Sequence, residues 1–153
     1  QAIKRCYEVL KPGGRIGTQA PAKKRYCPQF LDAFEKAVQD PRTPHSFRSF
    51  VSPWFFLESS EDYKTFFEKE GFEVESAEIL SVSSRKTPDQ VMDSFESGAA
   101  LAYCKPDCYQ ESITQEEFDE FRNIVRNKFT DMADDSGAMD LIFNRIELVA
   151  KKP

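Results

Sequence analysis

The sequence has few of the residues from which metal sites, disulfide frameworks and glycine-rich loops are built. It holds one histidine, His45, with four cysteines and six glycines among 153 residues. Cys104 and Cys108 have three residues between them, whereas a zinc knuckle has two. The four cysteines also lack the dense spacing of a secreted disulfide protein. We therefore expect free thiols in a reducing cytosol and no metal site.

Long apolar runs and an excess of positive charge are also absent. No run approaches the roughly 18 apolar residues that a membrane-spanning helix requires. The net charge is −5, whereas nucleic acids and acidic membranes attract basic surfaces. Hydrophobic residues make up 40% of the chain and include 14 phenylalanines. We expect one cytoplasmic domain over residues 1–153 with a strongly aromatic core, and no nucleic-acid or membrane partner.

The first twenty residues predict a helix, a tight turn and a strand. Ala2, Ile3, Cys6 and Leu10 recur at helical spacing, which predicts a helix over about 1–10. Pro12 cannot continue that helix, and Gly13 can adopt the left-handed conformation that closes it. A strand over about 15–20 should follow and end at Pro21.

Capping signals and apolar periodicity predict the remaining elements. Pro28 suits a first helical position, and Thr87 and Thr114 each begin a capping box. These signals predict helices at about 28–39, 60–70, 88–97 and 115–130, and strands at about 72–82 and 139–151. The last strand is apolar on both faces, so we expect it in the middle of a sheet that helices cover.

Residues 41–58 are irregular and rich in aromatic side chains. This loop carries Phe47, Phe50, Trp54, Phe55 and Phe56. So many aromatic rings must contact other parts of the protein. Two interpretations remain open, in which the loop either covers one end of the core or lines a pocket for a substrate.

The run Leu10-Lys11-Pro12-Gly13-Gly14 and the short strand after it resemble the class I S-adenosylmethionine-dependent methyltransferases. Three further segments resemble the small-molecule branch of this family, near trans-aconitate methyltransferase: Glu61 to Val74, a helical lid insert at about 87–131, and the ending Phe143 to Lys152. The resemblance implies an α/β fold, the back half of a Rossmann-like domain. Its three-stranded mixed sheet would have the order 15–20, 139–151, 72–82, with the last strand central and antiparallel.

The resemblance also implies what the chain does. In the family this motif lies past the middle of the catalytic domain, whereas here it begins at the seventh residue. We therefore expect a carboxyl-terminal half, inactive alone, whose parent transfers a methyl group from S-adenosylmethionine to a small molecule such as a carboxylic acid. No Gly-rich loop follows a strand, so we expect no cofactor-binding residues here and no measurable binding of S-adenosylmethionine. The alternative is a stand-alone α+β ligand-binding or protein-interaction domain without enzymatic activity.

Four residues are candidates for binding the methyl acceptor, and no catalytic residue is identified. Gln19 lies at the carboxyl end of a strand, where open α/β sheets bind ligands. Trp54 on the aromatic loop and Tyr103 on the insert would wall a pocket or simply pack. Arg145, like Arg85, would bind a carboxylate, although an ion pair of Arg145 with an acid such as Asp140 is the alternative. If the strand at 15–20 has a free edge, we also expect a homodimer through it.

Overall fold

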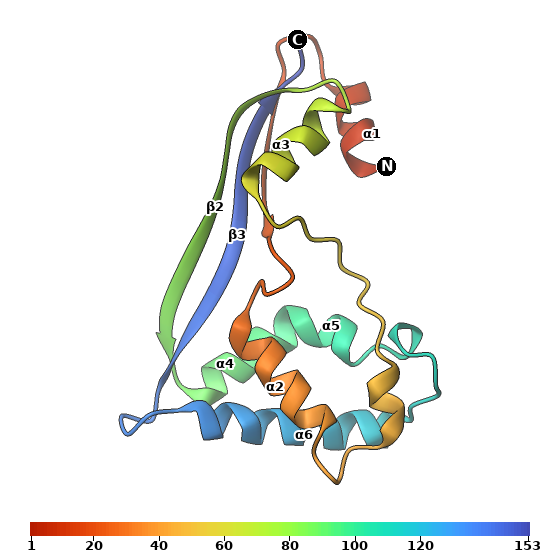
Figure 1. Ribbon diagram of the computed structural model, residues 1–153, viewed down its shortest axis with the longest axis vertical. Helices are drawn as coiled ribbons and strands as arrows, with labels where there is room; N and C mark the ends of the chain where they lie inside the picture. The colour runs from red at the N-terminus through yellow and green to blue at the C-terminus, as the bar shows by residue number, and fades with distance from the viewer. The chain divides into compact units, whose positions relative to one another are not determined.

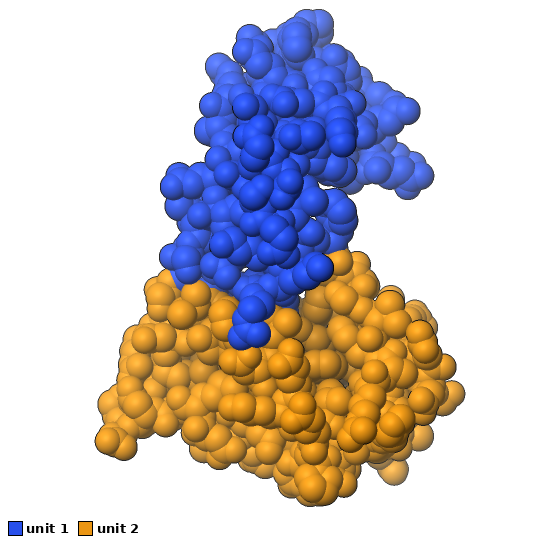
Figure 2. Space-filling model, in the orientation of Figure 1, with its two compact units in different colours: residues 1–26, 55–82, 143–153 blue, residues 27–54, 83–142 orange.

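The structure is a computed structural model that describes all residues 1–153. The chain forms two compact units (Figure 2). The first, here called the sheet unit, comprises residues 1–26, 55–82 and 143–153. The second, here called the helical unit, comprises residues 27–54 and 83–142. The expectation of a single domain over 1–153 with a lid insert at about 87–131 stays a prediction.

The fold is mixed α/β, with one three-stranded sheet in the order β1-β3-β2. The strands are β1 (Arg15–Pro21), β2 (Glu73–Lys86) and β3 (Met139–Lys151). Strand β3 is antiparallel to β1, with a register that runs from Arg15 opposite Lys151 to Pro21 opposite Arg145. Figure 1 shows β2 also running opposite to β3. The predicted strand order, with the last strand in the centre, is confirmed. The sheet was expected to be mixed, but all its neighbouring strands are antiparallel.

The expectation that helices cover both faces of this sheet is wrong for the sheet unit. Ile146, Leu148 and Ala150 of β3 are buried, whereas Glu147 and Val149 between them are exposed. The prediction of two apolar faces came from Leu141, Ile142, Phe143, Ile146, Leu148 and Val149. Between Leu141 and Ile146 the buried positions of β3 change from odd to even residue numbers. Each half of the strand therefore buries alternate residues, but the two halves bury different sets.

Two helices pack on the buried face of the sheet, α1 (Ala2–Val9) and α3 (Ser60–Glu68). Ser59 and Asp62 form a capping box at the start of α3, as the acidic first turn favours. The rings of Tyr7 and Phe72 are nearly perpendicular, with centroids 5.1 Å apart. The buried core here contains Ala22, Tyr63, Phe67, Phe72, Ile146, Leu148 and Ala150.

The turn after α1 is held by the end of β3. Gly13 has a φ of +78°, which confirms the predicted left-handed residue. Its N–H donates to the carbonyl oxygen of Lys152 at 2.8 Å, and the N–H of Lys152 donates to the carbonyl oxygen of Gly14 at 2.8 Å. The Lys152 ammonium also donates to the carbonyl oxygens of Tyr7 and Leu10, both at 2.8 Å. A positive charge thus caps the carboxyl end of α1, where the helix dipole favours it.

The helical unit is built from α2 (Pro28–Val38), α4 (Pro88–Ser94), α5 (Ala100–Tyr103) and α6 (Gln115–Met132). The predicted capping boxes are present, Thr87 with Gln90 and Thr114 with Glu117. In place of the single helix expected over 88–97, α4 ends at Ser94. A π-helical turn, Phe95–Ala99, follows it directly. Short 3-10 helices lie at His45–Ser49 and Pro106–Cys108. None of the helices combines the length and apolar composition needed to cross a membrane.

Aromatic rings fill the core of the helical unit. Phe47 from the aromatic loop stacks on Phe121 of α6 with centroids 4.3 Å apart, and both are buried. Phe55 from the same loop is 65% exposed. Phe47 therefore covers the core, as the first interpretation of the loop holds. The fully buried phenylalanines of this unit are Phe30, Phe47, Phe95, Phe118, Phe121 and Phe129.

Candidate functional site

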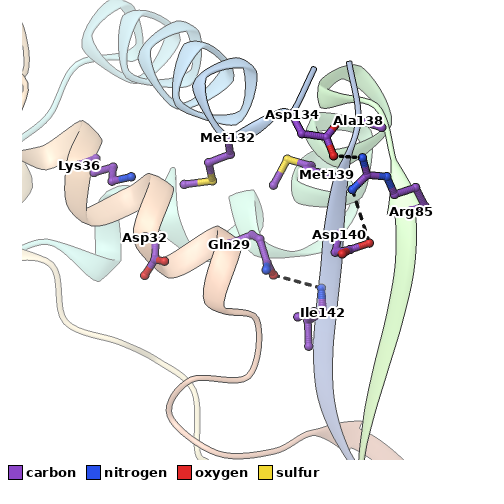
Figure 3. A pocket seen from close by; sticks show the side chains of 10 residues that line it. All are labelled: Gln29, Asp32, Lys36, Arg85, Met132, Asp134, Ala138, Met139, Asp140 and Ile142. Carbon is purple, nitrogen blue, oxygen red and sulfur yellow. Dashed lines mark hydrogen bonds and ion pairs between the residues drawn. The ribbon is translucent and has the colours of Figure 1, made fainter. Parts of the chain in front are cut away.

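A polar pocket of about 430 Å³ lies within the helical unit (Figure 3). Its walls come from one side of α2, the last residues of β2, the end of α6 and the first residues of β3. Apolar side chains and charges of both signs face it. The charged residues that line it are Asp32, Lys36, Arg85, Asp134 and Asp140.

Arg85 is engaged by acidic side chains at one side of this pocket. Its guanidinium donates to the Asp134 carboxylate and to the Ser136 hydroxyl, the latter at 2.9 Å. It also lies 3.8 Å from the carboxylate of Asp140. The Ser136 hydroxyl and then the Arg85 guanidinium hold the pKa of the Asp134 carboxyl well below its usual range. The turn between α6 and β3 is therefore tied to β2, and the charge of Arg85 is satisfied within the chain.

Two other groups in the pocket are available to a ligand. The side-chain oxygen of Gln29 accepts the N–H of Ile142 at 3.0 Å, which leaves its amide nitrogen as a donor. Figure 3 shows the Lys36 side chain directed into the pocket near Met132. Met132 and Met139 supply an adaptable apolar wall. Lys36 and the amide nitrogen of Gln29 can donate to a carboxylate, whereas Asp32, Asp134 and Asp140 bring three negative charges to the same lining.

Two of the predicted substrate-binding residues, Trp54 and Tyr103, meet in the helical unit. Their ring centroids are 4.9 Å apart with the planes nearly perpendicular. Tyr103 is 2% exposed, and its ring stacks on Phe34 at 4.3 Å. The hydroxyl of Tyr109 donates to the backbone carbonyl of Tyr103. Tyr103 therefore holds the core together, and a role of either ring in binding substrate stays a prediction.

The other two predicted residues, Gln19 and Arg145, lie in the sheet unit. The amide nitrogen of Gln19 donates to the Glu147 carboxylate at 2.8 Å. The Arg145 guanidinium lies 5.1 Å from the centre of the Phe143 ring. Asp140, named above as a partner for Arg145, lies beside Arg85 instead. Binding of a substrate by Gln19 or Arg145 stays a prediction.

The polar residues that α2 contributes to the pocket were not predicted from the sequence. Gln29, Asp32 and Lys36 are spaced three and four residues apart, so they share one face of the helix. That spacing could have been found, but it resembles any solvated helix face. No sequence pattern pairs the acidic turn at 134–137 with Arg85.

The residues of this chain do not fit S-adenosylmethionine. Binding its nucleoside part calls for glycines between a strand and the following helix, where the backbone approaches the ligand. No glycine lies between β1 and α2 or between β2 and α4. Gly71, with a φ of +94°, joins a helix to the following strand, which is the opposite connection.

No known protein family and no curated protein matches this sequence. A solved structure from Bacillus halodurans, a protein provisionally described as a methyltransferase, is similar over 99% of this chain. The two share 16% sequence identity with a TM-score of 0.45, and this chain spans 61% of the length of that one. At that level of likeness, any functional assignment rests on the chain's own residues.

Proposed function

We propose that this chain is the carboxyl-terminal half of a class I S-adenosylmethionine-dependent methyltransferase that acts on a small molecule. One observation carries the proposal: β3 is last in sequence but lies between β1 and β2. The resemblance of Leu10-Lys11-Pro12-Gly13-Gly14 to that family implies this same order. Consecutive strands usually pair, but here β1 and β2 are separated by β3.

The cofactor, in this proposal, binds to residues outside the 153 described here. The glycines of this chain stand at turns before strands or within other elements, so they offer no loop for a nucleoside. Isothermal titration of the 153-residue chain with S-adenosylmethionine should show no measurable binding. A dissociation constant in the micromolar range would overturn this part of the proposal.

The acceptor that this chain supports best is a small carboxylic acid. Lys36 offers a positive charge and Gln29 an amide donor in one pocket, and both recognise carboxylates. A carboxylate is already nucleophilic, so its methylation requires positioning and exclusion of water more than a base. Met132 and Met139 would contact the apolar part of the acid.

The longest natural polypeptide that contains this chain is the protein to test. Labelled S-adenosylmethionine and a panel of small carboxylic acids should yield labelled methyl esters. The Lys36→Met variant should raise KM for the acid by about tenfold with kcat little changed, because it removes binding common to ground and transition states. Lys64→Met, at a half-buried position of α3 in the sheet unit, is the matched control and should leave KM unchanged.

Two results would contradict this proposal. Absence of labelled product from every acid would overturn the reaction, and equal KM values for wild type and Lys36→Met would overturn the acceptor site. The rival function is a stand-alone ligand-binding domain, favoured by the same pocket. In that case the acids would bind with the same dependence on Lys36 but no methyl group would be transferred.

A further inference from the structure

We infer that the small molecule bound in the pocket of the helical unit is zwitterionic, an α-amino acid with a flexible apolar side chain. This inference rests on the proposed function, because it names the class of acceptor that the same pocket receives. It follows from the sign and the spacing of the charges that line the pocket, and from the way in which Arg85 is already engaged.

Negative charge exceeds positive charge in the lining of this pocket. Two cations and three carboxylates line it: Lys36, Arg85, Asp32, Asp134 and Asp140. The Arg85 guanidinium donates to Asp134 and lies 3.8 Å from Asp140, so its charge is matched by acids of the chain. A ligand with only a carboxylate would add to the negative excess, whereas an ammonium group on the same ligand would offset it. The pocket is therefore better matched to a molecule that carries both charges.

One carboxylate and one cation of α2 are spaced to bind the two charged groups of an amino acid. Asp32 and Lys36 are four residues apart on α2, which places their Cβ atoms about 5–6 Å from each other on one face of the helix. The ammonium and carboxylate groups of an amino acid are bonded to the same carbon, so they can contact two neighbouring side chains together. Figure 3 shows Lys36 directed toward Met132, with no ion pair between it and Asp32. The two charges therefore do not neutralise each other.

The roles of the remaining lining residues follow from their chemistry. A carboxylate such as Asp32 accepts hydrogen bonds at both oxygens, so it can bind an ammonium group alongside a partner within the chain. Met132 and Met139 line the same pocket, and methionine side chains adapt to the shape of an apolar chain beside them. L-Norleucine, which combines the two charges with a linear apolar side chain, is therefore the probe to test.

Binding of three related compounds to the 153-residue chain tests this inference without the cofactor. L-Norleucine carries both charges, hexanoate lacks the ammonium group, and pentylamine lacks the carboxylate. In isothermal titration at pH 7, the dissociation constant of L-norleucine should be at least about tenfold lower than that of either other compound, because each charge-assisted hydrogen bond adds to binding. Hexanoate binding as tightly as L-norleucine would overturn the inference, and so would the absence of binding by all three at about 10 mM.

Two substitutions should each affect a different pair of compounds. Asp32→Asn should weaken the binding of L-norleucine and pentylamine about tenfold without weakening that of hexanoate. Lys36→Met should weaken the binding of L-norleucine and hexanoate about tenfold without weakening that of pentylamine. Equal weakening of all three compounds by Asp32→Asn would mean a structural role and would overturn the assignment of the ammonium group to Asp32.

Glu35→Gln is the matched control for these variants. It removes a charge from an exposed position of the same helix, and Glu35 lines a different groove, beside Phe47 and Arg48. The affinities of all three compounds should stay unchanged. A loss of L-norleucine affinity as large as that of Asp32→Asn would mean that the general charge of α2, and not a bound ammonium group, causes the effect, and would overturn the inference.

The same measurements separate this inference from the proposed function. If hexanoate binds with the expected dependence on Lys36 and L-norleucine binds no more tightly, the ammonium site is wrong and the carboxylic-acid acceptor stands. If L-norleucine binds as expected but the longer natural polypeptide transfers no methyl group to it or to any other acid, the amino-acid site stands and the methyltransferase assignment is overturned.

Discussion

The sheet unit and the helical unit are stabilised in different ways. Among the largest fully buried side chains, only Ile146 and Leu148 belong to the sheet unit, whereas the helical unit contains all the phenylalanines of that group. The sheet unit has a smaller buried core and adds the backbone ladder between β1 and β3 and the turn that Lys152 caps. Loss of buried side-chain volume should therefore lower the free energy of unfolding most in the helical unit. Backbone strain should lower it most in the sheet unit.

The largest expected effect comes from deleting an aromatic ring in the helical unit. Phe121 is 1% exposed and stacks on Phe47 at 4.3 Å. Phe121→Ala should lower the free energy of unfolding by about 3–5 kcal/mol, because it leaves a cavity in a close-packed core. Urea denaturation followed by circular dichroism measures this change.

Phe55→Ala provides the matched control, since the same ring is removed from a residue of the sheet unit that is 65% exposed. We expect a loss below about 1 kcal/mol. Equal losses for Phe121→Ala and Phe55→Ala would contradict the view that buried aromatic volume distinguishes the two units.

A smaller effect should follow from backbone strain in the sheet unit. Gly71 has a φ of +94°, and a Cβ there would lie 3.1 Å from the Tyr7 ring. Gly71→Ala should cost about 1–2 kcal/mol for the left-handed conformation and about 1 kcal/mol more for displacing that ring. Gly13→Ala is the matched control, because Gly13 has a φ of +78° and no neighbour within 4 Å of its Cβ. Thermal unfolding of both variants gives the comparison; equal losses would mean that Tyr7 moves aside freely.

The sequence was informative where local signals decide the structure. The capping boxes at Thr87 and Thr114, the left-handed Gly13 and the bounds of β3 were predicted because each depends on a few adjacent residues. The central position of β3 followed from the family resemblance and from its apolar run. The switch of the buried positions in β3 from odd to even numbers was not predicted. A run of adjacent apolar residues does not show which of them face the core.

The candidate pocket was harder to predict, because its walls come from segments far apart in the sequence. Arg85 was named as a carboxylate ligand, but Asp134 lies 49 residues away and engages it. Lys36 was overlooked because a lysine on a polar helix face is usually a solvated charge. Trp54 and Tyr103 were chosen separately, and only the packing of the helical unit brings their rings together.

The smallest effect should come from an ion pair within the helical unit, and it should depend on pH. Asp40 follows α2, and its carboxylate accepts hydrogen bonds from Arg42 at 2.9 Å and from Lys128 of α6 at 3.0 Å. Arg42 and then Lys128 hold the pKa of the Asp40 carboxyl well below its usual range. A carboxylate whose pKa is lowered by folding stabilises the protein above its unfolded pKa of about 4, and this stabilisation is lost as the pH falls further.

Asp40→Asn should therefore lower the free energy of unfolding at pH 7, and the difference from wild type should shrink below about pH 4. High salt should also reduce it, because the partners Arg42 and Lys128 are partly exposed to solvent. Asp131→Asn, at an exposed position of α6, removes the same charge and should cause a smaller loss at pH 7. Urea denaturation at several pH values measures both variants. A difference for Asp40→Asn that stays constant or grows in acid would show that the packing of the asparagine, and not the charge, causes the loss.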